Sequence, residues 1–153
     1  HKKITLEEVE RAVKLTNEAG IKSLGFFIIG NLDENKETIR QTVDFAKKIP
    51  LTYAQFSIGI PYPGTEFYDV AKKNNWLKAE GWEDFIEDKR ATIVEMPGLE
   101  REYLEEAFRK FNKEFYFRPN YVLKQMFSSM RSWDDFLLTF KGFSWVIKAA
   151  FKL

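Results

Sequence analysis

The 153-residue sequence contains no cysteine and only one histidine, at position 1. Without cysteine, the chain can form no disulfide, no thiolate zinc site, no cysteine nucleophile and no cysteine-held iron–sulfur cluster of its own. A single histidine at the first position gives no basis for a histidine-based catalytic centre. No other side chain stands out as an acid, base or nucleophile, so the sequence predicts no catalytic residue and no metal ligand within this chain.

The sequence also lacks an excess of charge of one sign and a long apolar run. The 24 basic side chains nearly balance the 23 acidic ones, so no general electrostatic attraction to nucleic acid is expected. No run of about 18 apolar residues predicts a transmembrane helix, and no signal peptide is visible at the N-terminus. These absences point to a cytoplasmic protein.

What the sequence does have is enough apolar surface for a packed core, with 44% hydrophobic and 16% aromatic residues. The chain opens directly into a helical pattern, because Thr5 and Glu8 have the spacing of a capping box. His1 is not a start methionine, so we expect the chain to be a piece of a longer protein.

Helices and strands alternate over residues 1–75. The predicted elements are a helix from Thr5 to Gly20, a strand that ends at Gly30, a helix over 36–48 capped by Asn35, a strand over 53–60 and a helix over 65–74. This alternation predicts βα units with parallel strands. The uninterrupted apolar run before Gly30 predicts a strand buried on both faces. Two strands do not make a stable sheet alone, so we expect neighbouring strands from elsewhere.

The remaining chain divides into a connector over residues 76–97 and a helical extension over residues 98–153. Pro119 interrupts the helical pattern, a short helix follows from Tyr121 to Met130, and a last helix begins near Ser132 or Asp134. From residue 118 onward the sequence has six basic and two acidic side chains, a net charge of +4. The basic residues are Arg118, Lys124, Arg131, Lys141, Lys148 and Lys152, and the acidic ones are Asp134 and Asp135. With its aromatic stripe, the last helix either lies on a membrane surface or docks on another part of the protein.

Three segments carry a resemblance to a known family. They are Gly25-Phe-Phe-Ile-Ile-Gly30-Asn-Leu-Asp-Glu34, Phe56-Ser-Ile-Gly-Ile-Pro61-Tyr-Pro-Gly-Thr65 and Phe115-Tyr-Phe-Arg-Pro-Asn-Tyr121. They resemble the fifth and sixth βα units and the tail of radical S-adenosylmethionine (radical SAM) enzymes, above all the group with an upstream cobalamin-binding domain. After the first strand only Gly30 and Glu34 match the Gly-Leu-Pro-Gly-Glu-Thr segment of that group, whereas Pro-Tyr-Pro-Gly-Thr matches fully.

The resemblance implies an α/β fold: the C-terminal half of a partial (β/α)6 TIM-like barrel, followed by an all-helical extension. It implies a fragment that contributes part of the S-adenosylmethionine pocket. The intact parent would cleave S-adenosylmethionine reductively, for hydrogen abstraction or for cobalamin-dependent methyl transfer or cyclisation. The 4Fe-4S cluster would be held by cysteines upstream of residue 1. Whether cobalamin binds stays open.

The implied partners are the upstream half of the barrel, a cobalamin-binding domain and a small, lipid-like substrate, with peripheral membrane contact left open. The alternative is a non-catalytic, barrel-derived interaction module with a membrane- or partner-binding helical tail.

The implied cofactor-binding residues follow the two strands, because ligands of parallel sheets lie at the carboxyl ends of the strands. They are Ile28, Gly30, Asn31, Ser57 and Ile58. Gly30 would let the backbone approach a flat base, or would only end the strand with a positive φ angle. Ser57 would contact the ligand or only hydrogen-bond to the backbone. Both alternatives stay open in the sequence.

Overall fold

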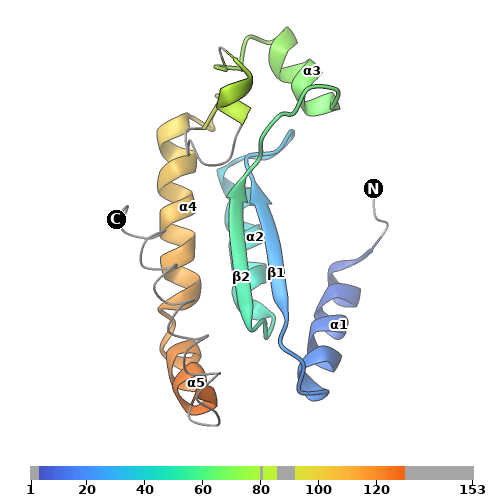
Figure 1. Ribbon diagram of the computed structural model, residues 1–153, viewed down its shortest axis with the longest axis vertical. Helices are drawn as coiled ribbons and strands as arrows, with labels where there is room; N and C mark the ends of the chain where they lie inside the picture. The colour runs from blue at the N-terminus through green and yellow to red at the C-terminus, as the bar shows by residue number, and fades with distance from the viewer. Residues whose placement is uncertain (1–3, 80, 86–91, 130–153) are drawn as a thin grey trace. The chain divides into compact units, whose positions relative to one another are not determined.

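The computed structural model describes residues 4–79, 81–85 and 92–129 (Figure 1). The chain divides into two compact units, residues 1–106 and residues 107–153. The first unit holds, in chain order, α1 (Leu6–Glu18), β1 (Leu24–Ile29), α2 (Lys36–Lys48), β2 (Tyr53–Ile58), α3 (Glu66–Lys73) and the short 3-10 helix η1 (Trp82–Phe85). Helix α4 (Arg101–Tyr116) begins in the first unit and ends in the second, and α5 (Pro119–Ser129) follows it.

The alternation of helices and strands predicted for residues 1–75 is confirmed. The helix over 36–48 has the predicted bounds, and the capping box of Thr5 and Glu8 is present at the start of α1. The chain also breaks after α4 and resumes at Pro119, the first residue of α5. The last predicted helix, with the aromatic stripe and lysines discussed above, lies outside the described residues.

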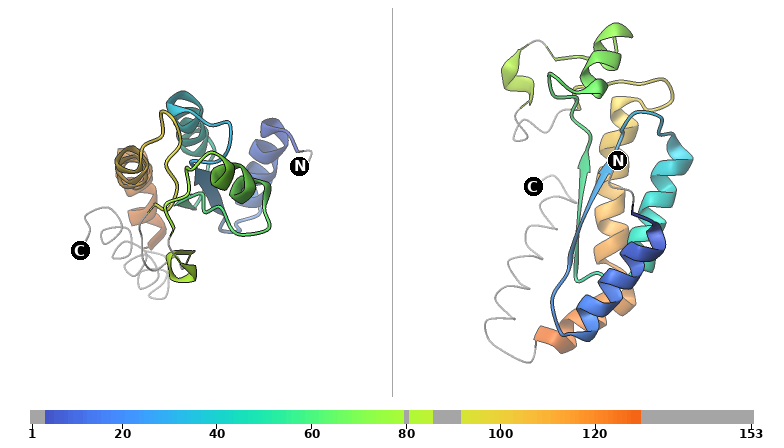
Figure 2. Two further views of the ribbon diagram at one scale, coloured as in Figure 1. Left: turned by 90° about the horizontal axis from the view of Figure 1, so that it is seen from above. Right: turned by 90° about the vertical axis from the view of Figure 1, so that its right-hand side faces the viewer.

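Strands β1 and β2 form a parallel, two-stranded sheet in which Leu24 pairs with Tyr53 and Ile29 with Ile58. Because paired residues of neighbouring strands share a face and successive residues alternate, the register defines both faces of the sheet. Helix α2 lies along one of them (Figure 2). This covered face consists of Gly25, Phe27, Ile29, Ala54, Phe56 and Ile58. The opposite face, called the open face below, consists of Leu24, Phe26, Ile28, Tyr53, Gln55 and Ser57.

The core of the first unit lies between the covered face and α2. Helix α2 buries Ile39, Val43 and Ala46, and β2 buries Ala54 and Phe56. The phenyl rings of Phe27 and Phe56 stack with their centroids 5.3 Å apart. The apolar stripe of α2 therefore fixes which face of the sheet is buried.

The expectation that β1 is buried on both faces is wrong for the described residues. Burial alternates along β1, and the side chains of Leu24, Phe26 and Ile28 are 49%, 69% and 50% exposed. The apolar run requires cover on both sides in principle, but residues 4–79, 81–85 and 92–129 cover only the side that faces α2.

The predicted half of a partial (β/α)6 TIM-like barrel is also corrected. The described residues form a small α/β arrangement with a two-stranded parallel sheet and helices. The sequence pattern correctly predicted the alternating helices and strands of βα units. It does not report the number, tilt or stagger of the strands, which together decide whether a sheet closes into a barrel.

Helix α2 depends on a capping box at its N-terminus. The Asn35 side-chain oxygen accepts hydrogen bonds from the backbone N–H groups of Glu37 and Thr38, at 2.9 and 3.0 Å. The hydroxyl of Thr38 in turn accepts one from the backbone N–H of Asn35, at 2.9 Å. Lys47 and Lys48 occupy the last turn, where positive charge is favourable.

We therefore expect Asn35→Ala to lower the free energy of unfolding by about 1 kcal/mol, because two backbone donors lose their partner. Urea unfolding measures this effect. Gln41→Ala, an exposed change on the same helix, is the control and should cost less than about 0.5 kcal/mol. Equal losses for the two variants would show that the cap does not stabilise α2.

The second unit is described by its own contacts. The rings of Phe115, Tyr116 and Tyr121 meet at centroid distances of 5.0 to 5.5 Å. The guanidinium of Arg118 lies over the Phe115 ring, 4.3 Å from its centroid, and Arg118 Nε donates to the Phe115 carbonyl. Burial lowers the pKa of Arg118. Arg118 is thus packed among aromatic rings, and its stacking on Phe115 gives it a structural role.

Candidate functional site

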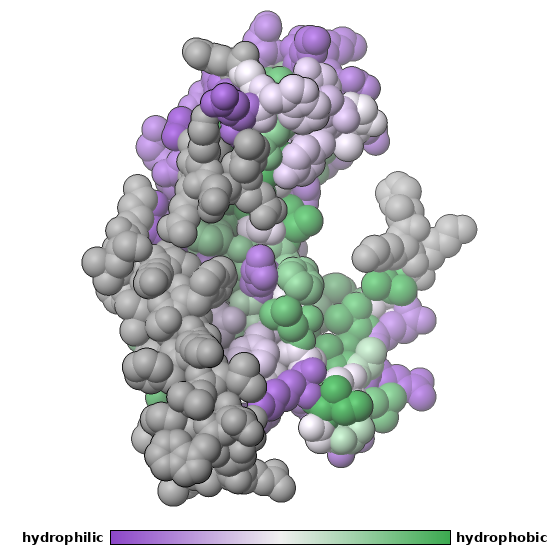
Figure 3. Space-filling model, viewed as in Figure 1, coloured by the Kyte–Doolittle hydropathy of each residue, from purple (hydrophilic) through white to green (hydrophobic). Residues whose placement is uncertain are grey.

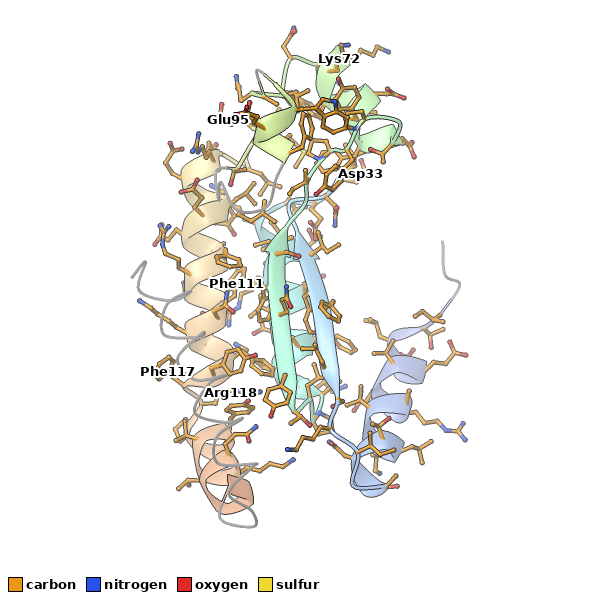
Figure 4. The ribbon with its side chains drawn as sticks, viewed as in Figure 1. Asp33, Lys72, Glu95, Phe111, Phe117 and Arg118 are labelled. Carbon is orange, nitrogen blue, oxygen red and sulfur yellow. The ribbon has the colours of Figure 1, made fainter. Side chains whose placement is uncertain are left out.

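The carboxyl ends of β1 and β2 meet at one edge of the sheet, where two loops come together. After β1 the backbone turns at Gly30, whose φ is +78°, and again at Asp33, whose φ is +63°. The Glu34 carboxylate accepts a hydrogen bond from the backbone N–H of Asn31, at 2.8 Å. Figure 4 places Asp33 beyond the end of β1, at the same end of the unit as Lys72 of α3. Glu34 therefore closes a short loop around Asn31, directly after the strand.

Gly59 joins this loop to the end of β2. Its backbone N–H donates to the Ile29 carbonyl, at 2.8 Å. A Cβ on Gly59 would lie 3.0 Å from the side-chain oxygen of Asn31, 3.2 Å from the Gly30 carbonyl oxygen and 3.3 Å from the Phe67 ring. The loop after β1, the end of β2 and helix α3 thus approach one another as closely as a glycine permits.

The five predicted cofactor-binding residues do not all face the same way. Ile28 and Ser57 are a register pair on the open face, Ile28 exposed and Ser57 half-buried. Ile58 is half-buried and lies on the covered face, so its side chain points away from those two. Asn31 is half-buried at the edge between them. The structure therefore pairs Ile28 with Ser57 on the open face, places the Ile58 side chain on the covered face and leaves Asn31 in the loop after β1.

Gly30 is buried on the inner side of the turn. A Cβ there would lie 3.1 and 3.2 Å from the two methyl groups of Leu104 in α4, and 3.7 Å from Ile58. The positive φ and the contact with Leu104 each favour glycine without any ligand. That Gly30 lies near a bound cofactor stays a prediction, but the structural requirement for glycine is evident.

The β1 half of the open face, which consists of Leu24, Phe26 and Ile28, is apolar. Figure 3 shows hydrophobic residues gathered over β1 and α1. On α1, Leu6 and Leu15 are exposed, and no residue of that helix is buried. Helix α1 is held by an ion pair between Glu10 and Lys48, at 2.8 Å, and, near its C-terminus, by a hydrogen bond from the Asn17 side chain to the Pro50 carbonyl. Much of the apolar surface of β1 and α1 thus stays uncovered by the described residues.

The charged side chains next to this edge include Asp33 and Glu34 in the loop after β1 and Lys36 at the start of α2. Lys36, at the start of α2, lies 3.5 Å from the Glu100 carboxylate and 4.6 Å from the centroid of the Tyr103 ring. A backbone hydrogen bond, helped by Lys36, lowers the pKa of Glu100, whereas burial raises the pKa of Tyr103. Residues 4–79, 81–85 and 92–129 contain no group of three His, Cys, Asp or Glu side chains that could hold a metal ion.

Sequence reasoning missed Gly59 and Phe67 as parts of this edge. The signal for Gly59 was a glycine at the end of a strand, which commonly marks close backbone approach. Its contact with Asn31 could not be read in advance, because it depends on the pairing of Ile29 with Ile58.

Comparisons with known proteins place the chain beside methyltransferases. It is 36% identical over 126 residues to an uncharacterized methyltransferase of Pyrococcus horikoshii, covering 82% of this chain and 27% of that protein. It is 26% identical over 136 residues to bacteriochlorophyllide d C-12(1)-methyltransferase of Chlorobaculum tepidum, covering 86% of this chain and 28% of the relative. It is 27% identical over 121 residues to cytidylyl-2-hydroxyethylphosphonate methyltransferase of Streptomyces wedmorensis, covering 74% of this chain and 22% of that protein.

The chain thus spans little more than a quarter of the length of the first two relatives. No family model matches it. A second bacteriochlorophyllide methyltransferase of Chlorobaculum tepidum is 28% identical over 79 residues.

These findings correct the assignment to the radical SAM family. All four relatives are named as methyltransferases, and no name refers to radical chemistry. The motif that matched fully is also explained locally. Thr65 N–H and Oγ donate to the Tyr62 carbonyl at 3.1 and 2.6 Å, and Thr65 Oγ accepts from the Tyr68 N–H at 3.2 Å. Pro-Tyr-Pro-Gly-Thr is therefore a rigid turn with an N-cap, a device that does not define one family.

The functions implied by that resemblance are corrected with it. Reductive cleavage for hydrogen abstraction, the 4Fe-4S cluster and cobalamin have no support in the named relatives or in the residues of this chain, which contains no cysteine. The alternative of a non-catalytic module with a binding tail gains no support either. No helix within the described part of the chain is long and apolar enough to cross a membrane.

Proposed function

We propose that this chain is part of a methyltransferase that uses S-adenosylmethionine as its methyl donor. The proposal rests on the similarity to named methyltransferases, together with the edge at which β1 and β2 end side by side. S-adenosylmethionine supplies a methyl group activated on a sulfonium sulfur. The residues of this chain bind and orient that donor, and the reacting groups lie in the rest of the protein.

The donor lies against the carboxyl end of the open face. Ile28 offers an exposed apolar side chain to the flat adenine ring, and Ser57, directly opposite, offers a hydroxyl group. The Asn31 side-chain amide at the edge can donate and accept hydrogen bonds. Gly30 and Ile58 support the site without contacting the donor through their side chains. Gly30 allows the turn after β1, and the Ile58 side chain packs next to Gly30. This arrangement combines apolar walls with a few polar groups, as ligand sites generally do.

The acceptor carries a planar conjugated ring. Two of the relatives are named for bacteriochlorophyllide d, whose macrocycle is flat and conjugated, and a third for a cytidylyl compound, whose base is flat.

Further polypeptide of the intact protein covers the open face. The exposed side chains of Leu24 and Phe26 would be buried there, and the edge of β1 that pairs with no strand among the described residues would find hydrogen-bond partners. The relatives are almost four times as long as the matched span, which leaves ample chain for this role.

The test compares two residues that share a strand, a face and an exposure. Ile28 and Leu24 both lie on the open face of β1 and are 50% and 49% exposed, but they lie at opposite ends. In the intact protein, Ile28→Ala should weaken S-adenosylmethionine binding about tenfold, because one apolar contact is worth about 1.4 kcal/mol. Leu24→Ala should change it less than twofold.

Isothermal titration calorimetry gives both affinities, and thermal unfolding verifies that the two variants fold equally well. If Leu24→Ala weakens the binding as much as Ile28→Ala, the donor does not lie at the carboxyl end. If the unchanged protein binds no S-adenosylmethionine, the proposed function is wrong.

A further inference from the structure

Four aromatic side chains gather beyond the carboxyl end of β2. The ring of Phe85 is buried, and three ring centroids surround it: Tyr62 at 6.2 Å, Tyr68 at 6.3 Å and Trp82 at 5.6 Å. Tyr62 belongs to the turn after β2, Tyr68 to α3, and Trp82 and Phe85 to η1. These four residues, called the aromatic cluster, tie three segments together.

Packing explains the centre of the aromatic cluster but not its outer rings. Phe85 fills the space between the segments, as a small satellite core requires. Trp82, however, is 72% exposed, and Tyr62 is 42% exposed. Trp82 stands at 72° to the Phe85 ring, so one edge is supported while most of its surface stays free. A large exposed indole contributes little to folding, which points to a role in binding.

The aromatic cluster adjoins the proposed donor site. Tyr62 follows Gly59 by three residues, so their Cα atoms lie within about 11 Å of each other. A Cβ added at Gly59 would lie 3.0 Å from the Asn31 side-chain oxygen and 3.3 Å from the Phe67 ring, so both side chains lie close to Gly59. Thr65 holds the Tyr62 carbonyl through its N–H and its hydroxyl, and the turn contains two prolines. Tyr62 is thus held on a rigid turn, at a distance from the donor that one small molecule can span.

The chemistry of the aromatic cluster selects its ligand. Exposed indole and phenol rings stack on flat conjugated rings and have little affinity for isolated anions. Among the described residues, Lys78 lies 3.5 Å from the Glu95 carboxylate and Lys72 lies over the Tyr68 ring. Glu83 and Asp84 follow Trp82 directly and would repel an anionic ligand. Figure 4 shows Lys72 and Glu95 at this end of the unit. A planar, largely uncharged ring system fits these surroundings.

We propose that the aromatic cluster is the acceptor subsite, where Trp82 and Tyr62 stack on the planar conjugated ring of the molecule to be methylated. This inference rests on the proposed function, because it places the acceptor beside the methyl donor. It assigns Trp82 and Tyr62 to acceptor binding and leaves the donor to Ile28, Asn31 and Ser57.

The experiment measures binding of pheophorbide a, a flat chlorin, to the intact protein by fluorescence titration. Trp82→Leu should weaken this binding at least tenfold, whereas Trp82→Phe, which keeps an aromatic face, should weaken it less than threefold. Phe117→Leu removes an exposed ring outside the aromatic cluster and should have no effect. Cholate, a rigid apolar molecule without a conjugated ring, should bind equally to all four proteins.

Several results would overturn the inference. The inference is wrong if Trp82→Leu binds the chlorin as tightly as the unchanged protein does, or if the unchanged protein binds no chlorin. It is also wrong if Trp82→Leu loses cholate binding in parallel with chlorin binding, because that would indicate a general apolar patch. S-adenosylmethionine affinity, measured in the same samples, should stay within twofold in every variant. Absence of donor binding in the unchanged protein would reject the proposed function, while the chlorin result would still decide whether the aromatic cluster binds a flat ring.

Discussion

Gly30→Ala is expected to lower the free energy of unfolding by about 2 to 3 kcal/mol. For an alanine at φ +78°, the left-handed backbone conformation costs roughly 1 to 2 kcal/mol. Its Cβ would also press on both methyl groups of Leu104, at 3.1 and 3.2 Å, and overpacking of this kind costs about 1 kcal/mol or more. Urea unfolding, monitored by circular dichroism, gives the loss.

Two other glycines separate these contributions. Gly64 has a φ of +87°, but a Cβ added there would meet no atom within 4 Å, so Gly64→Ala should show the backbone cost alone, about 1 kcal/mol. Gly81 has neither a positive φ nor a close neighbour, so Gly81→Ala should be nearly neutral. If Gly30→Ala costs no more than Gly64→Ala, Leu104 moves aside freely and the contact is not a constraint.

Local signals in the sequence predicted the elements of the first unit well. Asn35 is a typical N-cap residue and Pro50 lies just beyond the end of α2, so the bounds of this helix could be predicted closely. These signals act over three or four residues, where the backbone hydrogen bonds of a helix terminus are satisfied. The parallel pairing followed from the alternation of helices and strands along the same stretch of chain.

Long-range features could not be predicted in the same way. The contact between Gly30 and Leu104 joins residues 74 positions apart, and no periodicity reports it. The apolar run of β1 indicated burial on both faces, yet a sequence does not say which chain segment covers each face. The barrel was wrong because closure depends on strands beyond the two that these residues form.

The sequence indicated which residues lie at the carboxyl ends of the strands but not which way their side chains point. Parallel strands place ligands at their carboxyl ends, which gave Ile28, Asn31 and Ser57. The register then separated Ile58 from the other two strand residues, because neighbouring positions of a strand point to opposite faces. The exposed ring of Trp82 had no sequence signal, since its exposure depends on how η1 sits against Tyr62 and Tyr68.

Phe56→Ala is expected to have the largest effect on stability, about 3 to 5 kcal/mol. The Phe56 side chain is 2% exposed, lies on the covered face and stacks on Phe27, so its removal leaves a cavity beneath α2. Urea unfolding of the 153-residue protein measures the loss. A loss below about 1 kcal/mol would mean that the covered face is not the core of the first unit.

Phe26→Ala is the matched change on the other side of the sheet, and it tests what covers the open face. Phe26 is 69% exposed, so its truncation in the 153-residue protein should cost less than about 0.5 kcal/mol. In the intact, longer protein the same change should cost about 3 kcal/mol or more, because further polypeptide would bury the ring there. Phe56→Ala should cost nearly the same in both proteins, since α2 covers it in each. A small, equal effect of Phe26→Ala in both proteins would show that the open face stays exposed, and the proposal that the rest of the polypeptide covers it would be wrong.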